Sequence, residues 1–178
     1  MPINKQHRDF IKGDQEAFKE VYKNYKAFVF GISLRYTRCN DDAQDVFQET
    51  FIKVYEKRES FNPQYPFAPW IRQITVNCAL LYIRKNYQLI LTDNEDRLES
   101  AEESVFEKED ISFLKKKLLV FLNQLPEGYK VVFNLFVIDN LTHKEIAADL
   151  SISESTSRSQ LHKAKKMITK LVENYNYE

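Results

Sequence analysis

The chain has 178 residues, of which 43% are hydrophobic and 29% charged, and its 26 basic side chains balance 26 acidic ones, which allows one large domain or two small ones. No apolar run approaches the roughly 20 residues that span a bilayer, and the N-terminus lacks a signal-peptide core, so we expect neither a membrane-spanning nor a secreted protein. Only two cysteines occur, far apart, which excludes a disulfide scaffold and indicates a cytoplasmic protein with reduced thiols.

The zero net charge conceals a segregation of charge along the chain. Residues 1–86 carry 14 basic and 10 acidic side chains, residues 87–110 carry 2 and 9, and residues 111–178 carry 10 and 7. Glycine is scarce, helical spacing dominates and no two-residue alternation is sustained, so we expect an all-α fold. It would consist of two small helical domains, residues 1–86 and 111–178, joined by a flexible acidic linker over residues 87–110.

The first helical block runs from about Asp14 to Asn86. Its first helix carries aromatic residues at helical spacing, and this spacing predicts that they lie in the core. These residues are Phe18, Tyr22, Tyr25, Phe28 and Tyr36.

Residues 41–55 form a predicted amphipathic helix whose two faces differ in chemistry. At about 100° per residue, one face is apolar from Ala43 to Val54. The other face carries Asp41, Asp42, Asp45, Gln48, Glu49 and Ile52. A solvated acidic face is the simpler interpretation. An apolar residue among carboxylates and an amide is also typical of a protein-docking face.

Residues 61–69 contain three prolines and predict a rigid, extended loop before a helix that begins at Trp70. Rigid loops with aromatic and amide side chains can hold a base that has left the stack, and polar residues along the next helix add phosphate affinity. The candidate nucleic-acid contacts are Phe61, Asn62, Gln64, Tyr65 and Phe67 in the loop and Arg72, Gln73, Asn77 and Arg84 in the helix. Trp70 and Ile74, four residues apart, are expected in the core.

The second helical block begins near Ile111 and ends in a helix-turn-helix pattern. One helix face is predicted at Leu114, Leu118, Phe121, Leu122 and Leu125, and Pro126 marks the start of the next helix. Thr142 and Glu145 form a predicted capping box at the start of a helix that runs to Leu150. After a two-residue turn, Ser153 is the expected N-cap of a second helix that begins at Glu154.

The helix from Glu154 has the composition of a DNA-reading helix. Residues 153–170 include five basic side chains and one acidic side chain, and small hydroxyl residues stand at its N-terminus, where bases or phosphates would be met. A solvated basic face is the usual alternative, but the helix-turn-helix context favours DNA. The core stripe is expected at Leu161, Ala164, Met167, Ile168 and Leu171. The candidate DNA contacts are Lys144, Ser155, Thr156, Arg158, Ser159, His162, Lys163 and Lys166.

No catalytic or metal site is evident in the sequence. The chain has no Gly-rich phosphate loop, no paired metal-ligand spacing and no nucleophile elbow, so an enzyme is the least favoured class and we expect neither cofactor nor metal. The three histidines are scattered. His143 and His162 are therefore expected at the surface or facing DNA.

Three motifs, in this order and with the acidic segment between the second and the third, resemble those of bacterial RNA polymerase sigma factors of the extracytoplasmic-function group. Residues 42–51 are similar to the family's polymerase-binding helix, with Gln44 in place of the usual Glu. Residues 70–84 are similar to its promoter-melting helix, although Leu81 stands where many members carry Asp. Residues 125–127, 145–147, 151–153 and 156–164 are similar to the region that reads the upstream promoter element, and there Ser157 replaces a common aliphatic residue.

The resemblance implies a sigma factor that binds core RNA polymerase and directs promoter-specific initiation. The acidic face of residues 41–55 would bind the polymerase, the candidates in residues 61–84 would capture the melted downstream promoter element, and those in residues 144–166 would read the upstream element. Family members are often inhibited by a membrane-linked anti-sigma factor, so we expect such a partner, of unknown identity. The alternative is a helix-turn-helix regulator that binds an operator without being a polymerase subunit.

Overall fold

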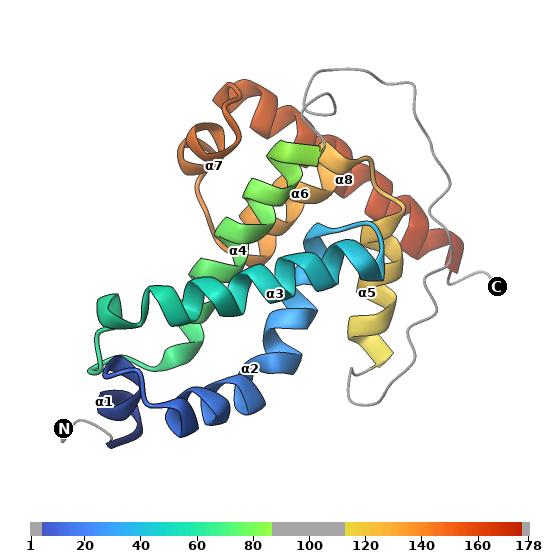
Figure 1. Cartoon of the computed structure of the whole chain (residues 1–178). Helices are drawn as coiled ribbons and strands as arrows, with labels where there is room; N and C mark the ends of the chain where they lie inside the picture. The colour runs from blue at the N-terminus through green and yellow to red at the C-terminus, as the bar shows by residue number, and fades with distance from the viewer. Residues whose placement is uncertain (1–4, 87–112, 176–178) are drawn as a thin grey trace. The chain divides into compact units, whose positions relative to one another are not determined.

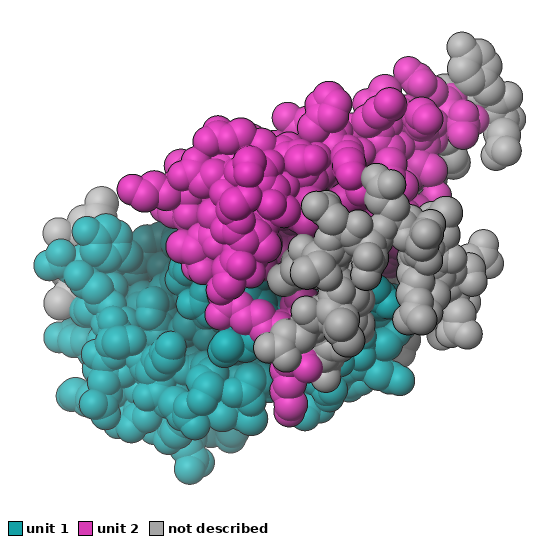
Figure 2. Space-filling model, turned by 90° about the horizontal axis from the view of Figure 1, so that it is seen from above, with its two compact units in different colours: residues 1–82 teal, residues 83–178 magenta. Residues whose placement is uncertain are grey.

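A computed structural model describes residues 5–86 and 113–175, which form helices and no strands (Figure 1), so the predicted all-α fold is confirmed. The chain divides into two compact units, residues 1–82 and 83–178, shown in different colours in Figure 2. The predicted linker, residues 87–110, lies outside the described residues. Within the described ranges, no helix has both the length and the apolarity needed to cross a membrane.

The described residues of the first unit are mainly helical. It contains α1 (Lys5–Ile11), α2 (Gln15–Tyr36), α3 (Asn40–Glu56), the 3-10 turn η1 (Arg58–Ser60) and most of α4 (Phe67–Asn86). The Asp14 carboxylate caps α2 by accepting a hydrogen bond from the Ala17 amide at 2.8 Å. No sequence signal predicted α1, yet its Phe10 side chain is only 1% exposed. Gly13, with φ of 81°, makes the turn between α1 and α2 in a conformation that favours glycine.

The predicted aromatic core face of α2 is only partly correct. Tyr36 is fully buried, Phe18 and Tyr25 are half-buried, and Tyr22 and Phe28 remain exposed at 40% and 39%. The apolar stripe that one helix turns toward its neighbours is narrower than the arc these five side chains cover. Val21 and Val29 occupy the core positions instead.

The second unit contains the helix-turn-helix. Its elements are the end of α4, α5 (Phe113–Asn123), α6 (Glu127–Phe133), the π-helical turn η2 (Asn134–Ile138), α7 (His143–Leu150) and α8 (Glu154–Tyr175). Leu122, Leu125 and Ala164 form a buried cluster, against which Met167 and Ile168 pack. The predicted apolar stripe of α8 therefore faces the core of this unit.

The turn between α7 and α8 contains a left-handed residue. Ser151 has φ of 56° and ψ of 43°, a conformation common directly after a helix. Its amide and the Ile152 amide both donate to the Ala147 carbonyl oxygen. These bonds end α7 and set the direction in which α8 leaves the turn.

Candidate nucleic-acid interface

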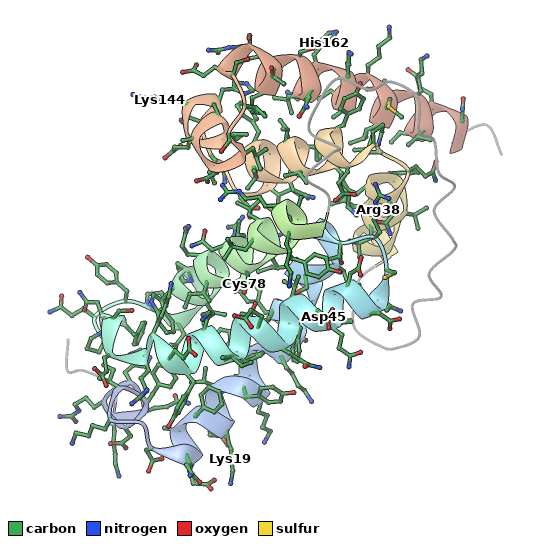
Figure 3. The ribbon with its side chains drawn as sticks, turned by 45° about the horizontal axis from the view of Figure 1, so that its top comes forward. Lys19, Arg38, Asp45, Cys78, Lys144 and His162 are labelled. Atoms are coloured by element: carbon green, nitrogen blue, oxygen red, sulfur yellow. The ribbon has the colours of Figure 1, made fainter. Side chains whose placement is uncertain are left out.

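The polar face of α3 is exposed, as the sequence predicts. Asp41, Asp45, Gln48 and Glu49 are exposed, and Ile52 is 51% exposed among them. The opposite face is buried and consists of Ala43, Val46, Thr50, Phe51 and Val54. Figure 3 labels Asp45 on this helix. α3 therefore presents carboxylates around an accessible apolar side chain.

Asp42 differs from the other members of this set. It is half-buried, and its Oδ1 atom accepts a hydrogen bond from the Tyr82 hydroxyl at 2.6 Å. This bond joins α3 to α4 within the first unit. Asp42 thus stabilises the packing of the two helices and is less accessible to a partner than Asp45.

Phe61 and Phe67 do not face nucleic acid, and this part of the prediction is wrong. They are 3% and 4% exposed, and their rings stack with centroids 4.3 Å apart and planes 13° apart. Two aromatic rings that flank a short loop gain more from burial against each other than from exposure to water. Residues 62–66 between them, here called the 62–66 loop, expose the other candidates, Asn62, Gln64 and Tyr65, with Tyr65 at 64%.

The 62–66 loop is shorter than predicted, because α4 begins at Phe67 rather than at Trp70. Pro69 lies in the first turn of α4, where its missing amide proton removes no helical hydrogen bond. Ile74 is buried, and Trp70 is half-buried against Phe61 with ring centroids 5.1 Å apart. The core assignment is therefore correct for Ile74, whereas Trp70 is only partly buried.

The polar candidates on α4 differ in exposure. Gln73 and Asn77 are exposed, and the Gln73 amide donates to the Asn77 side-chain oxygen at 3.4 Å. Arg72 and Arg84 are half-buried, and Arg84 belongs to the second unit. The two amides are thus the more accessible polar groups.

The caps of both helices of the helix-turn-helix form as predicted. The Glu145 amide donates to Thr142 Oγ1 at 3.3 Å, and the Thr142 amide donates to the Glu145 carboxylate at 2.8 Å, which completes the capping box. Hydrogen bonds from the Thr142 hydroxyl and amide lower the pKa of Glu145. At the start of α8, Ser153 Oγ accepts from the Thr156 amide at 3.0 Å.

The first turns of α8 expose most of the predicted DNA contacts. Ser155, Arg158, Ser159, His162 and Lys166 are exposed, as is Lys144 of α7, whereas Thr156 and Lys163 are half-buried. Figure 3 labels Lys144 and His162 on these two helices. The Arg158 guanidinium pairs with the Glu154 carboxylate one turn earlier, at 2.6 Å. A basic side chain is thereby held beside the N-terminus of α8, the end that enters DNA in helix-turn-helix proteins.

His143 is less exposed than expected. Its half-buried ring stacks on Phe136 with centroids 4.5 Å apart, and its Nδ1 lies 2.8 Å from the hydroxyl oxygen of the fully buried Ser157. Burial and the positive charge of Arg158 lower the pKa of His143. The imidazole therefore connects α7 to α8, and its lowered pKa favours the uncharged ring.

Two polar residues on the inner face of α8 are buried, which the sequence analysis did not predict. Ser157 is 0% exposed and Gln160 is 6% exposed. The Gln160 amide packs so closely on Gly128 of α6 that a Cβ at Gly128 would lie 3.1 Å from it. Their polarity hid them from a search for apolar stripes. Ser157 nevertheless precedes Leu161 and Ala164 at helical spacing, which was a signal that the stripe begins there.

Comparison with known proteins finds two matching family models and relatives that are similar over most of their length. Residues 21–88 match Sigma-70 region 2, and residues 115–168 match Sigma-70, region 4. The chain is 27% identical to ECF RNA polymerase sigma factor SigW of Bacillus subtilis, over 96% of each protein. It is 30% identical to the ECF RNA polymerase sigma-E factor of Haemophilus influenzae, over 88% of each protein. The Escherichia coli K12 sigma-E factor is 31% identical, over 91% of this chain and 90% of that protein.

Two solved structures share the fold. CnrH, solved in complex with the cytosolic domain of CnrY, is 21% identical with a TM-score of 0.51, over 95% of this chain and 96% of that chain. The sigma factor RpoE of Bartonella quintana, solved in complex with the anti-sigma factor NepR, is 20% identical with a TM-score of 0.50, over 88% of this chain and 96% of that chain.

Proposed function

The chain belongs to the extracytoplasmic-function (ECF) sigma factors of RNA polymerase, and from this membership we propose how its described surfaces divide the work of initiation. As a sigma factor it binds core RNA polymerase and promoter DNA and directs initiation at specific promoters. In this proposal the exposed face of α3 binds the core polymerase through Asp41, Asp45, Gln48, Glu49 and Ile52. Carboxylates speed and orient the encounter, and the apolar side chain supplies contact area.

The 62–66 loop and the exposed face of α4 capture the melted strand of the downstream promoter element. Asn62, Gln64 and Tyr65 offer two amides and an exposed ring to an unstacked base, and Gln73 and Asn77 extend this polar surface along α4. Arg72 and Arg84 add partly accessible positive charge. Phe61 and Phe67 are buried and support the loop, so they are not among the proposed DNA contacts.

The N-terminal half of α8 reads the upstream promoter element in the major groove. The proposed contacts are Ser155, Thr156, Arg158, Ser159, His162, Lys163 and Lys166, with Lys144 of α7 beside them. The observation that carries the proposal is the division of α8 into two faces, because Ser157, Gln160, Leu161 and Ala164 are buried while the hydroxyl and basic residues between them are accessible. The α8 surface and the 62–66 loop belong to one polymerase-bound chain. Once one of them binds its promoter element, the other is held near its own element at a high effective concentration, so each needs to bind DNA only modestly.

We infer three further properties, two from family membership and one from the solved structures. The chain acts as a non-catalytic initiation factor and works in the cytoplasm, where the polymerase is. Since CnrH and RpoE were each solved with a second protein, CnrY and the anti-sigma factor NepR respectively, we infer that an inhibitory protein of the same kind holds this chain inactive. Such a protein would compete with core polymerase for the chain.

Run-off transcription with core polymerase over a promoter library tests the proposed function. Transcripts should require both the chain and the polymerase, and they should share two spaced promoter elements. An operator-binding regulator would instead bind DNA without polymerase and yield no new start sites. That result would contradict the proposal.

The α3 assignment is tested with the double variant Asp45→Ala and Gln48→Ala. Its affinity for core polymerase should fall, because both side chains lie on the proposed contact face, while DNA binding by the second unit is retained. Glu173→Ala, which removes an exposed carboxylate at the far end of α8, is the matched control. Equal polymerase affinity of the double variant and the wild type would refute the docking assignment.

The α8 assignment is tested with Arg158→Ala. If Arg158 reads a base edge, the variant loses roughly 1–3 kcal/mol of binding free energy for the cognate promoter and little for promoters changed at that base. Lys170→Ala, an exposed basic residue farther along α8, is the control. An equal loss on every promoter would assign Arg158 to phosphate contact.

A further inference from the structure

The 62–66 loop must present its side chains in one arrangement if it is to capture an unpaired base. We propose that His7, in α1, is a positioning residue that holds the loop in that arrangement. The proposal rests on the function proposed for the loop. It adds to that function a residue from a helix that contributes none of the proposed DNA contacts.

His7 contacts the loop near its middle by a hydrogen bond. Its Nδ1 atom lies 3.1 Å from the Pro63 carbonyl oxygen, although 56 positions separate the two residues in sequence. Because a carbonyl oxygen can only accept, Nδ1 carries the proton and donates it. Both the Nδ1-protonated neutral ring and the imidazolium provide this donor.

His7 also contacts the two residues that flank the loop. Its ring meets the Phe61 ring edge-on with centroids 5.3 Å apart, and it meets the Phe67 ring edge-on at 4.5 Å. Phe61 immediately precedes the loop, and Phe67 immediately follows it. The His7 side chain thus contacts the residue before the loop, one residue within it and the residue after it.

The hydrogen bonds inside the loop have a different role. The Gln64 amide donates to the Asn62 side-chain oxygen at 3.0 Å, and the Tyr65 amide donates to the Asn62 carbonyl oxygen at 3.1 Å. Both bonds join loop residues to each other and shape a turn. The His7 bond instead ties that turn to another helix of the unit.

α1 can act as a support because it is itself anchored. Phe10, one turn after His7, is 1% exposed and lies against Phe18 of α2 and Trp70 of α4, with ring centroids 6.4 Å and 6.0 Å away. At the end of α1, Gly13 packs so close to η1 that a Cβ there would lie 3.1 Å from Arg58 Nε. The position of His7 is therefore set by the core of the first unit.

A loop that is ordered before binding loses less conformational freedom when it captures a base. Removal of the His7 donor should leave Asn62, Gln64 and Tyr65 chemically intact but less ordered. The expected effect is that of one hydrogen bond, roughly a threefold to tenfold loss of affinity for the melted strand.

The test uses the full chain assembled with core polymerase and a promoter recovered from the library. His7→Phe keeps an aromatic ring and removes the donor, whereas His7→Asn restores an amide donor near the position of Nδ1. Binding is measured on a promoter held open by mismatches over the downstream element. We expect His7→Phe to lose affinity roughly threefold to tenfold and His7→Asn to recover most of it. Wild-type affinity of His7→Phe, or no recovery with His7→Asn, would overturn the proposal.

A general loss of stability is recognised by two further measurements. In the free chain, amide hydrogen exchange should accelerate at Gln64 and Tyr65 in His7→Phe, while α2 and α3 keep wild-type exchange. The affinity for core polymerase should also stay unchanged. Faster exchange throughout the first unit, together with weaker polymerase binding, would contradict a positioning role.

The double variant Gln64→Ala and Tyr65→Ala separates this proposal from the function on which it rests. If the double variant weakens binding to the opened promoter and His7→Phe does not, only the His7 proposal fails. If the double variant binds like the wild type, the function proposed for the loop fails as well.

Discussion

The two units support their proposed DNA-contacting elements by different combinations of apolar packing and hydrogen bonding. In the first unit, the 62–66 loop rests on the stacked rings of Phe61 and Phe67. It is tied to α1 by the hydrogen bond from the half-buried His7 to the Pro63 carbonyl oxygen. In the second unit, α8 packs through the buried Leu161 and Ala164, and it is joined to α7 by the hydrogen bond between His143 and the fully buried Ser157. The free energy of apolar contact is non-directional and falls in proportion to the apolar area that a substitution removes. A buried hydrogen bond stabilises the fold only while both partners are present. The two elements should therefore respond differently to substitution and to pH.

The largest effect is expected from Phe61→Ala. The variant removes a buried ring and leaves a cavity beside Phe67, so the free energy of unfolding of the first unit should fall by about 3–5 kcal/mol. Urea unfolding followed by the fluorescence of Trp70, the only tryptophan of the chain, reports on this unit. Tyr65→Ala, at the exposed tip of the same loop, should change the value by less than about 0.5 kcal/mol. Similar values for the two variants would show that the stacked rings do not support the loop.

Ser157→Ala should have a smaller but more specific effect. It leaves Nδ1 of the half-buried His143 without its partner, at a cost of about 1–3 kcal/mol in the free energy of unfolding of the second unit. Combining it with His143→Phe should cost less than the sum of the two single changes, because both polar partners are then replaced. Chemical unfolding followed by circular dichroism measures all three variants. Ser155→Ala is the exposed control, and strict additivity would argue against coupling between His143 and Ser157.

The second unit should also lose stability in mild acid. The pKa of His143 in the folded state lies below its usual value of 6.5, so the unfolded chain takes up the proton first as the pH falls. Stability is therefore fully present above pH 6.5 and declines as the pH falls from there toward the lowered pKa. Thermal unfolding of the wild type and of His143→Phe at pH 7.5 and 5.5 measures this difference. An identical decline in the variant would assign the pH dependence to other groups.

The smallest effect is expected at the capping box of α7. The folded-state pKa of Glu145 is lowered from its usual 4.5, so the capping contact stabilises the fold above that pH and is lost as the pH falls through the lowered value. Glu145 is fully exposed, so the change should be small. Thr142→Ala should lose helicity at pH 6 relative to the wild type, and the gap should narrow at pH 3. If the difference in helicity between Thr142→Ala and the wild type did not change with pH, the stabilisation would come from the Thr142 hydroxyl alone.

Local signals in the sequence predicted the elements that carry these surfaces. Thr142 and Ser153 each mark a helix start by a bond to an amide three residues away, and both bonds form. The two faces of α3 follow from periodicity within one helix. Such features depend on neighbours within about one turn, so they can be found without knowledge of the fold.

The errors concern residues whose surroundings come from distant segments. Phe61 and Phe67 were assigned to DNA because loop aromatics often bind bases, and they are buried because each provides the other's contact surface together with His7. His143 was assigned to the surface or to DNA because the three histidines are scattered in sequence, and Ser157, 14 positions away, supplies its partner. Neither partner can be identified from spacing alone.

By itself, the sequence determined the all-α fold, the helix-turn-helix with its caps, the acidic face of α3 and the family to which the chain belongs, since these depend on local periodicity, capping chemistry and motif order. Only the tertiary structure decided which side chains remain accessible. In the folded chain Phe61, Phe67 and Ser157 are buried, and Asp42 and His143 are half-buried. His7, from a helix that the sequence did not predict, lies against Pro63. The physical reason is that burial is a property of pairs of surfaces, and chain folding brings those surfaces together from positions far apart in sequence.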